Sequence, residues 1–267
     1  MEAGISTYTY TWAIGVPGSE PEKPMTVFEL IETACTLDVK VVQIADNLPL
    51  EKFSIPELEQ IKQFADHGGI RIEVGARWMT LERIKMYLNI ARIMNSPILR
   101  FVIDGPGFEP SLEEIHSIVR HIVPELEKLN ICLVIENHDR LLAREFVEIV
   151  QRSGSKNVGI CLDTVNSMGA GEGLETVIGL LAPYTKNLHV KEFSIRRVSH
   201  KMGFVIEGVP LGKGMLPVTE LISKVSSHCQ SAILEQWTPP EPTIQETINK
   251  ESEWAIESIL YLKSVLS

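Results

Sequence analysis

Four residues of the kinds that bind metal ions lie at or near the ends of short apolar runs. Glu136 ends ICLVIE, Asp163 ends VGICLD, His189 lies in NLHVKEF and Glu235 follows the apolar residues of AILEQ. A carboxylate at the end of a buried strand loses much of its solvation free energy unless a cation, a hydrogen-bond network or water compensates it. The chemistry of this protein is therefore expected where these side chains meet.

The chain around these residues alternates β-rich runs with amphipathic segments of roughly ten to twenty residues. Ser111, with Glu114 three positions later, forms a capping-box pattern at the start of one such segment. Strands are expected at 4–11, 40–45, 71–76, 98–103, 131–136, 158–163, 187–193 and 232–236. Helices are expected at 25–37, 55–67, 80–95, 111–129, 143–152, 174–183, 216–228 and 250–266.

This alternation predicts a single domain, residues 1–267, with the α/β fold of a (β/α)8 TIM barrel. Eight strand–helix units with short links favour a closed barrel over an open doubly wound sheet, which usually has fewer strands. One connection, 194–215, is unusually long and follows the seventh strand. Long loops after barrel strands commonly build the functional site.

The last four predicted strands carry the metal-ligand residues at similar heights. Reacting residues of TIM barrels lie at the carboxyl ends of the strands, so neighbouring strands could present three carboxylates and one imidazole to a common point. Such donors suit Mn²⁺ or Mg²⁺ and could also take Co²⁺, Zn²⁺ or Fe²⁺. We expect one divalent metal ion, with Mn²⁺ as the first choice.

Composition excludes several classes of partner. A net charge of −10 disfavours nucleic acid. No window reaches 18 apolar residues, and the polar start STYTYTW does not resemble a signal peptide, so we expect a cytoplasmic protein without a membrane partner. The cysteines are widely spaced and are interpreted as reduced core residues: Cys35, Cys132, Cys161 and Cys229.

Several short motifs together resemble the xylose isomerase-like superfamily of TIM barrels, which includes sugar isomerases, epimerases and inosose-processing enzymes. The resemblance covers essentially the whole chain and is specific for the superfamily rather than for a substrate. The motifs that carry it are IEN (135–137), LDTVN (162–166), HVKE (189–192), GVPLGKGMLP (208–217) and ILEQ (233–236).

The resemblance implies that Glu136, Asp163, His189 and Glu235 bind one divalent metal, and that Glu136 and Glu235 also act as the catalytic acid/base pair. A metal that holds a carbonyl and an adjacent hydroxyl acidifies the C–H between them and stabilises the enediolate formed on proton removal. Two carboxylates on opposite sides of that carbon could remove and return the proton.

Further residues are candidates for substrate binding. Lys191 and His138 each lie two positions beyond a ligand candidate, and Asn166 occupies a position where many relatives have a histidine. Tyr8 is assigned to core packing in the first strand, whereas Trp12 could wall the barrel mouth. The full set of expected substrate contacts is Lys191, His138, Asn166, Arg196, Arg197, Trp12 and Glu207.

We therefore expect a metal-dependent isomerase or epimerase that acts on a small sugar, sugar acid or cyclitol through an enediolate. A metal-dependent lyase or dehydratase would use the same polarised carbonyl, and the ligand residues do not separate the two. A non-catalytic sugar-binding barrel is a further alternative, because a fold alone does not establish activity. An apurinic endonuclease is disfavoured by the acidic charge and by the absence of histidines after strands three and four. Relatives commonly form dimers or tetramers, so a homo-oligomer is possible.

Overall fold

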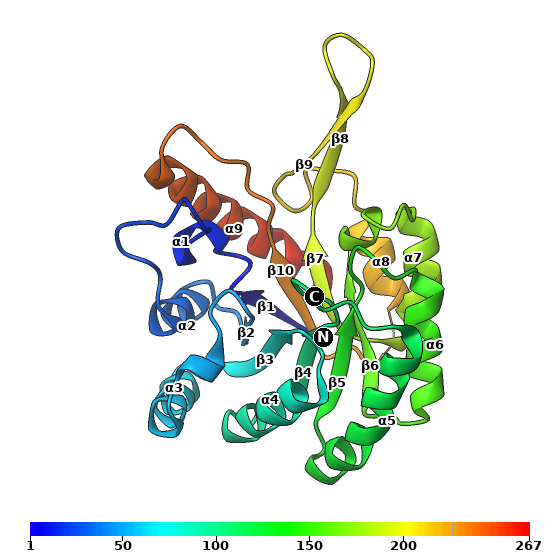
Figure 1. Ribbon diagram of the computed structural model, residues 1–267. Coiled ribbons are helices and arrows are strands. Elements are labelled where there is room, and N and C mark those ends of the chain that lie inside the picture. The colour runs from blue at the N-terminus through cyan, green and yellow to red at the C-terminus, as the bar shows by residue number, and fades with distance from the viewer. Residues whose placement is uncertain (226) are drawn as a thin grey trace.

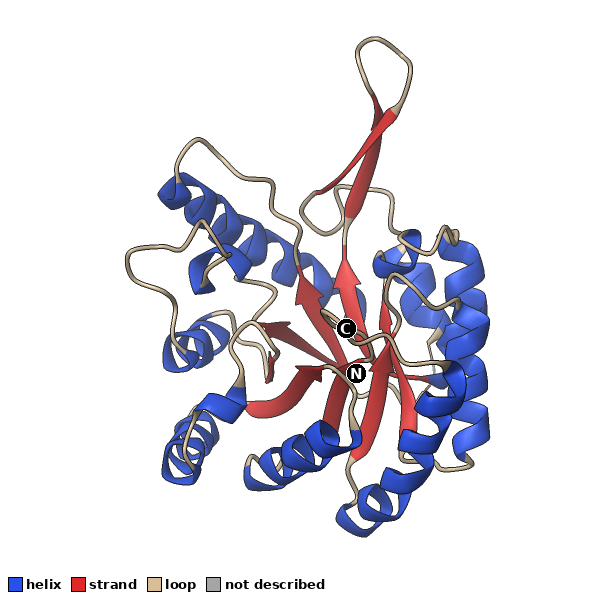
Figure 2. Ribbon diagram, in the orientation of Figure 1, coloured by secondary structure: helices blue, strands red, loops and turns tan. Residues whose placement is uncertain are grey.

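The computed structural model, which describes residues 1–225 and 227–267, confirms the predicted closed barrel of parallel strands surrounded by helices (Figures 1 and 2). Each strand pairs in parallel with its neighbours, and the first closes the barrel against the last. In order around the described barrel these are β1 (Glu2–Ser6), β2 (Val41–Ile44), β3 (Arg71–Arg77), β4 (Ile98–Val102), β5 (Cys132–Glu136), β6 (Val158–Asp163), β7 (Thr185–Lys191) and β10 (Ser231–Glu235).

The helices cover the outside of the barrel and bury one apolar face each against the strands (Figure 2). They are α1 (Thr11–Ile14), α2 (Val27–Thr36), α3 (Ile55–His67), α4 (Leu81–Ile93), α5 (Leu112–Leu129), α6 (Ala143–Ser153), α7 (Leu174–Leu181), α8 (Val218–Lys224) and α9 (Ile244–Leu266). Short 3₁₀ turns occupy Leu50–Lys52, Asn166–Met168 and Ala182–Tyr184.

The main apolar core lies between strands and helices, whereas the barrel interior carries many polar side chains. Outward-facing strand residues such as Leu133 and Ile135 belong to this core. Because side chains alternate along a strand, Glu136 shares the opposite, inward side of β5 with Cys132 and Val134. Buried polar residues inside a barrel need partners, which is why this interior determines the site.

The first predicted strand, 4–11, is wrong in its second half. β1 ends at Ser6, and Tyr8 and Trp12 therefore do not alternate along a strand. The Ser6 backbone N–H donates to Thr9 Oγ1 at 2.8 Å, and the Tyr8 N–H donates to Ser6 Oγ at 2.9 Å. These local side-chain bonds replace the strand ladder and turn the chain into α1.

The long connection after the seventh strand contains structure that the sequence analysis missed. β8 (Phe193–Arg197) and β9 (Phe204–Gly208) form an antiparallel hairpin that projects from the barrel (Figure 1). One side of the hairpin is apolar, with Ile195 directly opposite Ile206. The other side pairs Arg196 with Glu207. Residues near the base of the hairpin, Ile206, Glu207 and Gly208, line the pocket at the barrel mouth.

Three smaller expectations also differ from the structure. The last helix starts at Ile244 rather than at 250, because Thr243 and Glu246 form a capping box. The helix expected at 216–228 ends at Lys224, and residue 226 of that prediction lies outside the described residues. Cys35 is exposed on α2 rather than buried in the core, whereas the other cysteines are buried and free.

None of the helices in residues 1–225 and 227–267 combines the length and the apolar character needed to cross a bilayer.

Candidate active site

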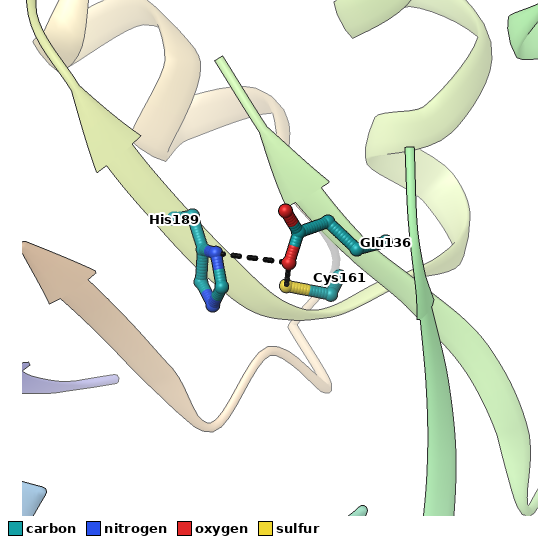
Figure 3. Close-up of side chains that lie close together, drawn as sticks. All are labelled: Glu136, Cys161 and His189. Atoms are coloured by element: carbon teal, nitrogen blue, oxygen red, sulfur yellow. Dashed lines mark hydrogen bonds and ion pairs between the residues drawn. The ribbon is translucent and has the colours of Figure 1, made fainter. Parts of the chain in front are cut away.

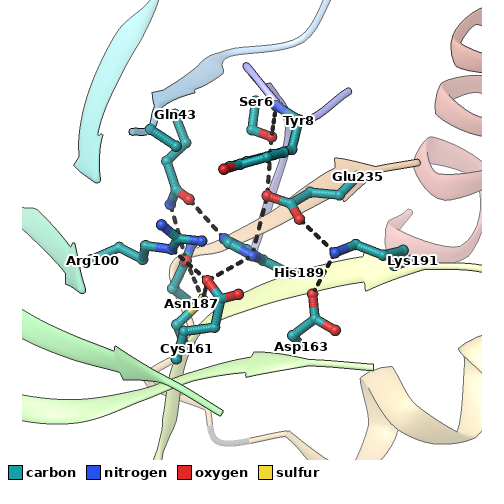
Figure 4. Close-up of polar contacts among 12 residues, drawn as sticks. Ser6, Tyr8, Gln43, Arg100, Cys161, Asp163, Asn187, His189, Lys191 and Glu235 are labelled. Atoms are coloured by element: carbon teal, nitrogen blue, oxygen red, sulfur yellow. Dashed lines mark hydrogen bonds and ion pairs between the residues drawn. The ribbon is translucent and has the colours of Figure 1, made fainter. Parts of the chain in front are cut away.

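The four ligand candidates converge inside the carboxyl end of the barrel. Nδ1 of His189 lies 3.3 Å from Glu136 Oε2 and 3.3 Å from Glu235 Oε1. Asp163 stands beside His189 in the strand register, and its ligand atom lies within 4.8 Å of those of His189 and Glu235. All four side chains are buried. Figure 3 shows the Glu136 carboxylate directed at the His189 imidazole, and Figure 4 shows the Glu235 and Asp163 carboxylates on either side of Lys191.

Backbone hydrogen bonds orient the Asp163 carboxylate toward this centre. Its Oδ1 accepts the N–H groups of Val165 and Asn166 at 2.8 and 2.9 Å, in the turn that follows β6. Its Oδ2 is buried and accepts no hydrogen bond from the described residues, although Lys191 Nζ is 3.0 Å away. One oxygen is thus fixed by the backbone and the other is directed into the site.

His189 is held from the opposite side. Its Nε2 lies 2.7 Å from Gln43 Oε1, deeper in the barrel. Its Nδ1 is buried without a hydrogen-bond partner in the described part of the chain. Metal-binding histidines commonly bind through one ring nitrogen while a second residue holds the other, and this arrangement fits that pattern.

Two buried cations complete the electrostatics of the site. Arg100, inward-facing on β4, contacts Glu136 through Nε and lies 3.2 Å from Asp46 Oδ1 through a terminal nitrogen. Lys191 Nζ lies 3.0 Å from both Asp163 Oδ2 and Glu235 Oε2. Figure 4 shows Arg100 and Lys191 on opposite sides of His189.

These charges move the pKa values in opposite directions. Burial alone would lower the pKa of Lys191, but Asp163, Glu235 and Glu136 raise it above its ordinary value. Burial alone would raise the pKa of Glu235, but His189, Lys191 and Arg100 hold it below its ordinary range. Lys191 therefore remains a cation and Glu235 remains an anion at neutral pH.

The residues present fit a divalent cation. Within the described residues, His189 Nδ1 and Asp163 Oδ2 are buried without hydrogen-bond partners. The His189 atom faces Glu136 and Glu235, and Asp163 lies close enough to His189 and Glu235 to share an ion with them. Carboxylate oxygens with one imidazole nitrogen are ligands that Mn²⁺, Mg²⁺ and Zn²⁺ all accept. Cys161 Sγ also lies 3.9 Å from Glu136 Oε2 (Figure 3), but burial raises the pKa of its thiol well above the ordinary value.

A pocket of about 500 Å³ opens above this cluster. Trp12, Trp237 and Ile206 supply apolar surface, and the ring of Trp237 lies 5.7 Å from Lys191 Nζ. Arg77 and His138 supply polar groups at the wall. Pockets of this size with a few convergent polar groups are suited to small molecules.

Five of the seven expected substrate contacts line this pocket. They are Lys191, His138, Asn166, Trp12 and Glu207. Asn166 also donates its amide to Glu136 Oε1 at 2.9 Å, so this residue touches a ligand candidate directly.

The two hairpin arginines are not brought to the described pocket wall. Arg196 pairs with Glu207 at 2.9 Å, and Arg197 stacks on Phe204 and donates to the backbone oxygen of Lys201. Both side chains belong to the exposed hairpin, and their roles in substrate binding remain predictions.

Sequence reasoning missed the charged and amide side chains buried within the strands. Within predicted strands that carry no expected site residue lie Arg100 (ILRFV), Glu73 (RIEVG) and Gln43 (VVQI). A signal was available, because a charged or amide residue in the middle of an apolar run needs a buried partner. Tyr8, expected in the core, instead lines the pocket and donates to Asp46 at 3.0 Å.

The glycine-rich motif after the hairpin is held by a buried carboxylate. Glu192 accepts the backbone N–H groups of Gly212 and Leu216 at 3.1 and 2.8 Å. A Cβ on Gly214 would lie 2.2 Å from the backbone oxygen of Phe193, so only glycine permits this approach. The loop is thus anchored at the base of the hairpin and next to Lys191.

Comparison with known proteins identifies the family of the chain. A family model described as "Xylose isomerase-like TIM barrel" matches residues 42–264. The 3-oxo-isoapionate decarboxylase of Pectobacterium atrosepticum is 30% identical over 264 residues, which cover 98% of this chain and 95% of the relative.

Solved structures agree on the fold. D-psicose 3-epimerase from Clostridium cellulolyticum H10, crystallised with D-tagatose, superposes with a TM-score of 0.74 at 16% identity, and all of both chains is covered. A xylose isomerase-like TIM barrel protein from Mycobacterium smegmatis, in complex with magnesium, gives a TM-score of 0.69 at 13% identity, covering 100% of this chain and 98% of the other. From the family match and the full-length relative, the chain belongs to the xylose isomerase-like TIM barrel family.

Proposed function

We propose that this protein is a metal-dependent decarboxylase of a small 3-oxo sugar acid, with the cation held by Glu136, Asp163, His189 and Glu235. The full-length relative with 30% identity is a decarboxylase of such an acid. The observation that carries the proposal is that both candidate bases of an epimerase are already engaged by other side chains.

Both oxygens of Glu136 are occupied. Arg100 contacts Oε2, and the Asn166 amide donates to Oε1 at 2.9 Å. Removing a proton from carbon requires a carboxylate with a free oxygen and a suitable affinity for the proton. These two contacts make Glu136 a poor candidate for the base that removes a proton from carbon.

Glu235 is engaged in the same way. Ser6 Oγ donates to its Oε1 at 3.1 Å, and Lys191 Nζ lies 3.0 Å from its Oε2. The cations around it hold its pKa below the ordinary value, which weakens it as a base. The two-carboxylate epimerisation expected from the sequence needs both Glu136 and Glu235 to exchange protons with carbon, whereas loss of CO₂ needs no base.

Loss of CO₂ from a 3-oxo acid is chemistry that this environment supports. The bond between the carboxylate carbon and C2 breaks, and its electron pair moves toward the C3 carbonyl to give an enolate. A proton from solvent then adds to C2, so that one CO₂ leaves and one hydrogen replaces it. The barrier depends on how well the developing negative charge on oxygen is stabilised.

The charges of the site suit this task. The buried carboxylates of Glu136, Asp163 and Glu235 lie among the buried cations of Arg100 and Lys191, and the half-buried Asp46 contacts both Arg100 and Arg77. With His189 neutral, these groups carry one excess negative charge, which favours the binding of a cation. Such an ion would supply a Lewis acid that polarises the substrate carbonyl. Lys191, at the pocket wall, adds a fixed positive charge beside the reacting oxygen.

Isomerisation or epimerisation of a small sugar, the reaction expected from the sequence, is the second candidate. Its support is the position of Glu136 and Glu235, each 3.3 Å from His189 Nδ1, so that both flank one centre. A dehydratase would use the same polarised carbonyl. The three reactions differ in their products.

Product analysis separates the candidates. A chelator first removes metal from the purified protein, and Mn²⁺ is then added back. The protein is incubated in D₂O with 3-oxo-isoapionate and, in separate reactions, with D-psicose and with D-tagatose. We expect CO₂ release from the 3-oxo acid, one deuterium at the former C2, and loss of activity without metal.

The His189→Gln variant tests the site because it removes one ligand. Its matched control is the His121→Gln variant, which carries the same change on the exposed face of α5. The first should lose activity and the second should retain it. If the protein converts a ketose to its epimer and releases no CO₂ from the 3-oxo acid, the decarboxylase proposal is wrong and epimerisation is supported instead.

A further inference from the structure

A buried polar network lies beneath His189, on the side away from the pocket. It joins Gln43 on β2, Glu73 on β3, Asn187 on β7 and Ser231 on β10, and each of these side chains is 0% exposed. TIM-barrel interiors are usually packed with branched apolar side chains. An ionisable residue surrounded by amides at this depth therefore requires a reason.

Glu73 is the anchor of this network. Gln43 and Asn187 donate their amide groups to its Oε2 at 3.2 and 3.1 Å. Ser231 Oγ donates to its Oε1 at 2.7 Å, and Arg71 lies 3.3 Å from the same oxygen. Burial raises the pKa of Glu73, whereas Ser231, Arg71 and Gln43 oppose this shift by favouring the ionised form. The ionised carboxylate only accepts hydrogen bonds, so every neighbouring group must turn a donor toward it.

This requirement sets the orientation of the Gln43 amide. Its Nε2 faces two acceptors, Glu73 Oε2 and Asn187 Oδ1, the latter at 3.0 Å. Asn187 is oriented in turn, because its own Nδ2 donates to Glu73 and to Ser231. Rotating either amide by half a turn would place an oxygen against the Glu73 carboxylate. Gln43 must therefore present Oε1 on its other side.

That oxygen lies 2.7 Å from His189 Nε2. An amide oxygen can only accept, so a neutral imidazole must carry its proton on Nε2, which leaves a lone pair on Nδ1. Nδ1 is the ring atom that faces Glu136 and Glu235. Glu73 thus fixes the orientation of the Gln43 amide, and Gln43 in turn fixes the proton position on His189 and leaves Nδ1 facing the proposed metal.

We propose that Gln43 and Glu73 are positioning residues which select the Nε2-protonated tautomer of His189 and so direct Nδ1 to the metal. The proposal rests on the metal site of the proposed function. It adds two residues from strands that carry none of the four ligands. Loss of an outer partner of a metal-binding histidine typically weakens metal binding by about 10- to 100-fold.

The experiment has two independent readouts. The first is the tautomer of His189 in the metal-free wild type, measured by ¹⁵N NMR at a pH where the imidazole is neutral, with the His189→Gln variant assigning the signal. We expect protonation at Nε2. Protonation at Nδ1 would overturn the proposal, and no activity or metal is needed for this measurement.

The second readout is the dissociation constant for Mn²⁺, measured by electron paramagnetic resonance. Gln43→Met keeps the length of the side chain but removes its amide, and we expect the constant to rise about 10- to 100-fold. Asn157→Leu is the matched control, because Asn157 is also a buried amide but donates to Ile131 O, away from His189. It should bind Mn²⁺ as the wild type does.

The outcomes distinguish this inference from the proposed function. Wild-type Mn²⁺ affinity in a folded Gln43→Met variant would overturn the positioning role. If Gln43→Met fails to fold, the wild-type tautomer still decides. A wild type that binds no divalent metal but carries the proton on Nε2 would remove the metal from the proposed function while supporting the tautomer selected by Gln43.

Discussion

Lys191 Nζ lies 3.0 Å from Glu235 Oε2, and both side chains are buried at the carboxyl end of the barrel. The two residues come from neighbouring strands and are paired in the β7–β10 register. Their contact places a permanent cation at the boundary between the ligand cluster and the substrate pocket.

This position predicts a catalytic effect for Lys191. The Lys191→Met variant should lose roughly 100-fold or more in kcat, because a fixed positive charge beside the reacting oxygen is removed. Steady-state kinetics with the 3-oxo acid measure the effect. Lys186→Met is the control, because Lys186 lies at the other end of β7 and bonds the backbone oxygen of Lys156. Equal activity of both variants would contradict the role of Lys191.

Arg100 is expected to matter for stability. Removing one partner of a buried ion pair leaves an uncompensated charge, so Arg100→Met should lower the free energy of unfolding by about 3–5 kcal/mol. Arg152→Met breaks the exposed contacts with Glu113 and Glu148 and should lower the free energy of unfolding much less, because solvent screens these charges. Urea denaturation of the metal-free proteins compares the two. A similar small loss in both variants would show that Glu136 and Asp46 tolerate the absence of Arg100.

Glu251 links α9 to the pocket wall and should make stability depend on pH. It is 1% exposed and accepts the backbone N–H groups of Trp12 and Ala13 at 3.0 and 3.1 Å. Burial raises the pKa of Glu251 from 4.5 to about 7, although these backbone donors oppose the shift. The folded state therefore binds the proton more tightly than the unfolded chain.

The sign of the effect follows from this difference. The contribution of Glu251 to stability is complete below about pH 4.5 and is lost as the pH rises through about 7. Glu251→Gln should remove up to about 3 kcal/mol of this fall in the free energy of unfolding between about pH 5 and 8. Glu253→Gln, on the exposed side of the same helix, should leave the slope unchanged. An unaltered slope in Glu251→Gln would rule out this source of pH dependence.

Two glycines should respond to alanine in opposite directions. Gly214→Ala places a Cβ against the Phe193 backbone oxygen and the Glu192 carboxylate, and should destabilise the protein by about 1–3 kcal/mol. Gly179→Ala lies in α7 with nothing within 4 Å of the added Cβ and should stabilise it by about 0.5–1 kcal/mol. Thermal or urea unfolding measures both, and a stable Gly214→Ala protein would show that the anchored loop can relax.

Local sequence patterns were sufficient to predict most of the fold. The period of apolar residues located the barrel strands and most helices, and the α3 boundaries at Ile55–His67 agree with the prediction. These features depend on residues close in sequence. The first strand was overextended because Ser6 and Thr9 form local side-chain bonds that periodicity does not detect. The β8–β9 hairpin was missed because its exposed strands do not carry a buried-strand pattern.

The candidate site was only partly accessible from the sequence. Residue types at strand ends indicated Glu136, Asp163, His189 and Glu235, because parallel strands of a barrel bring such ends together. The sequence alone thus determined which groups could bind a metal. The partners of these groups come from distant strands: Arg100 reaches Glu136, and Gln43 reaches His189 across 146 positions. Closure of the barrel decides these contacts, because hydrogen bonds and ion pairs depend on side-chain distances that no local pattern encodes. Only the tertiary structure could therefore show that both candidate bases are occupied and that His189 is held from below.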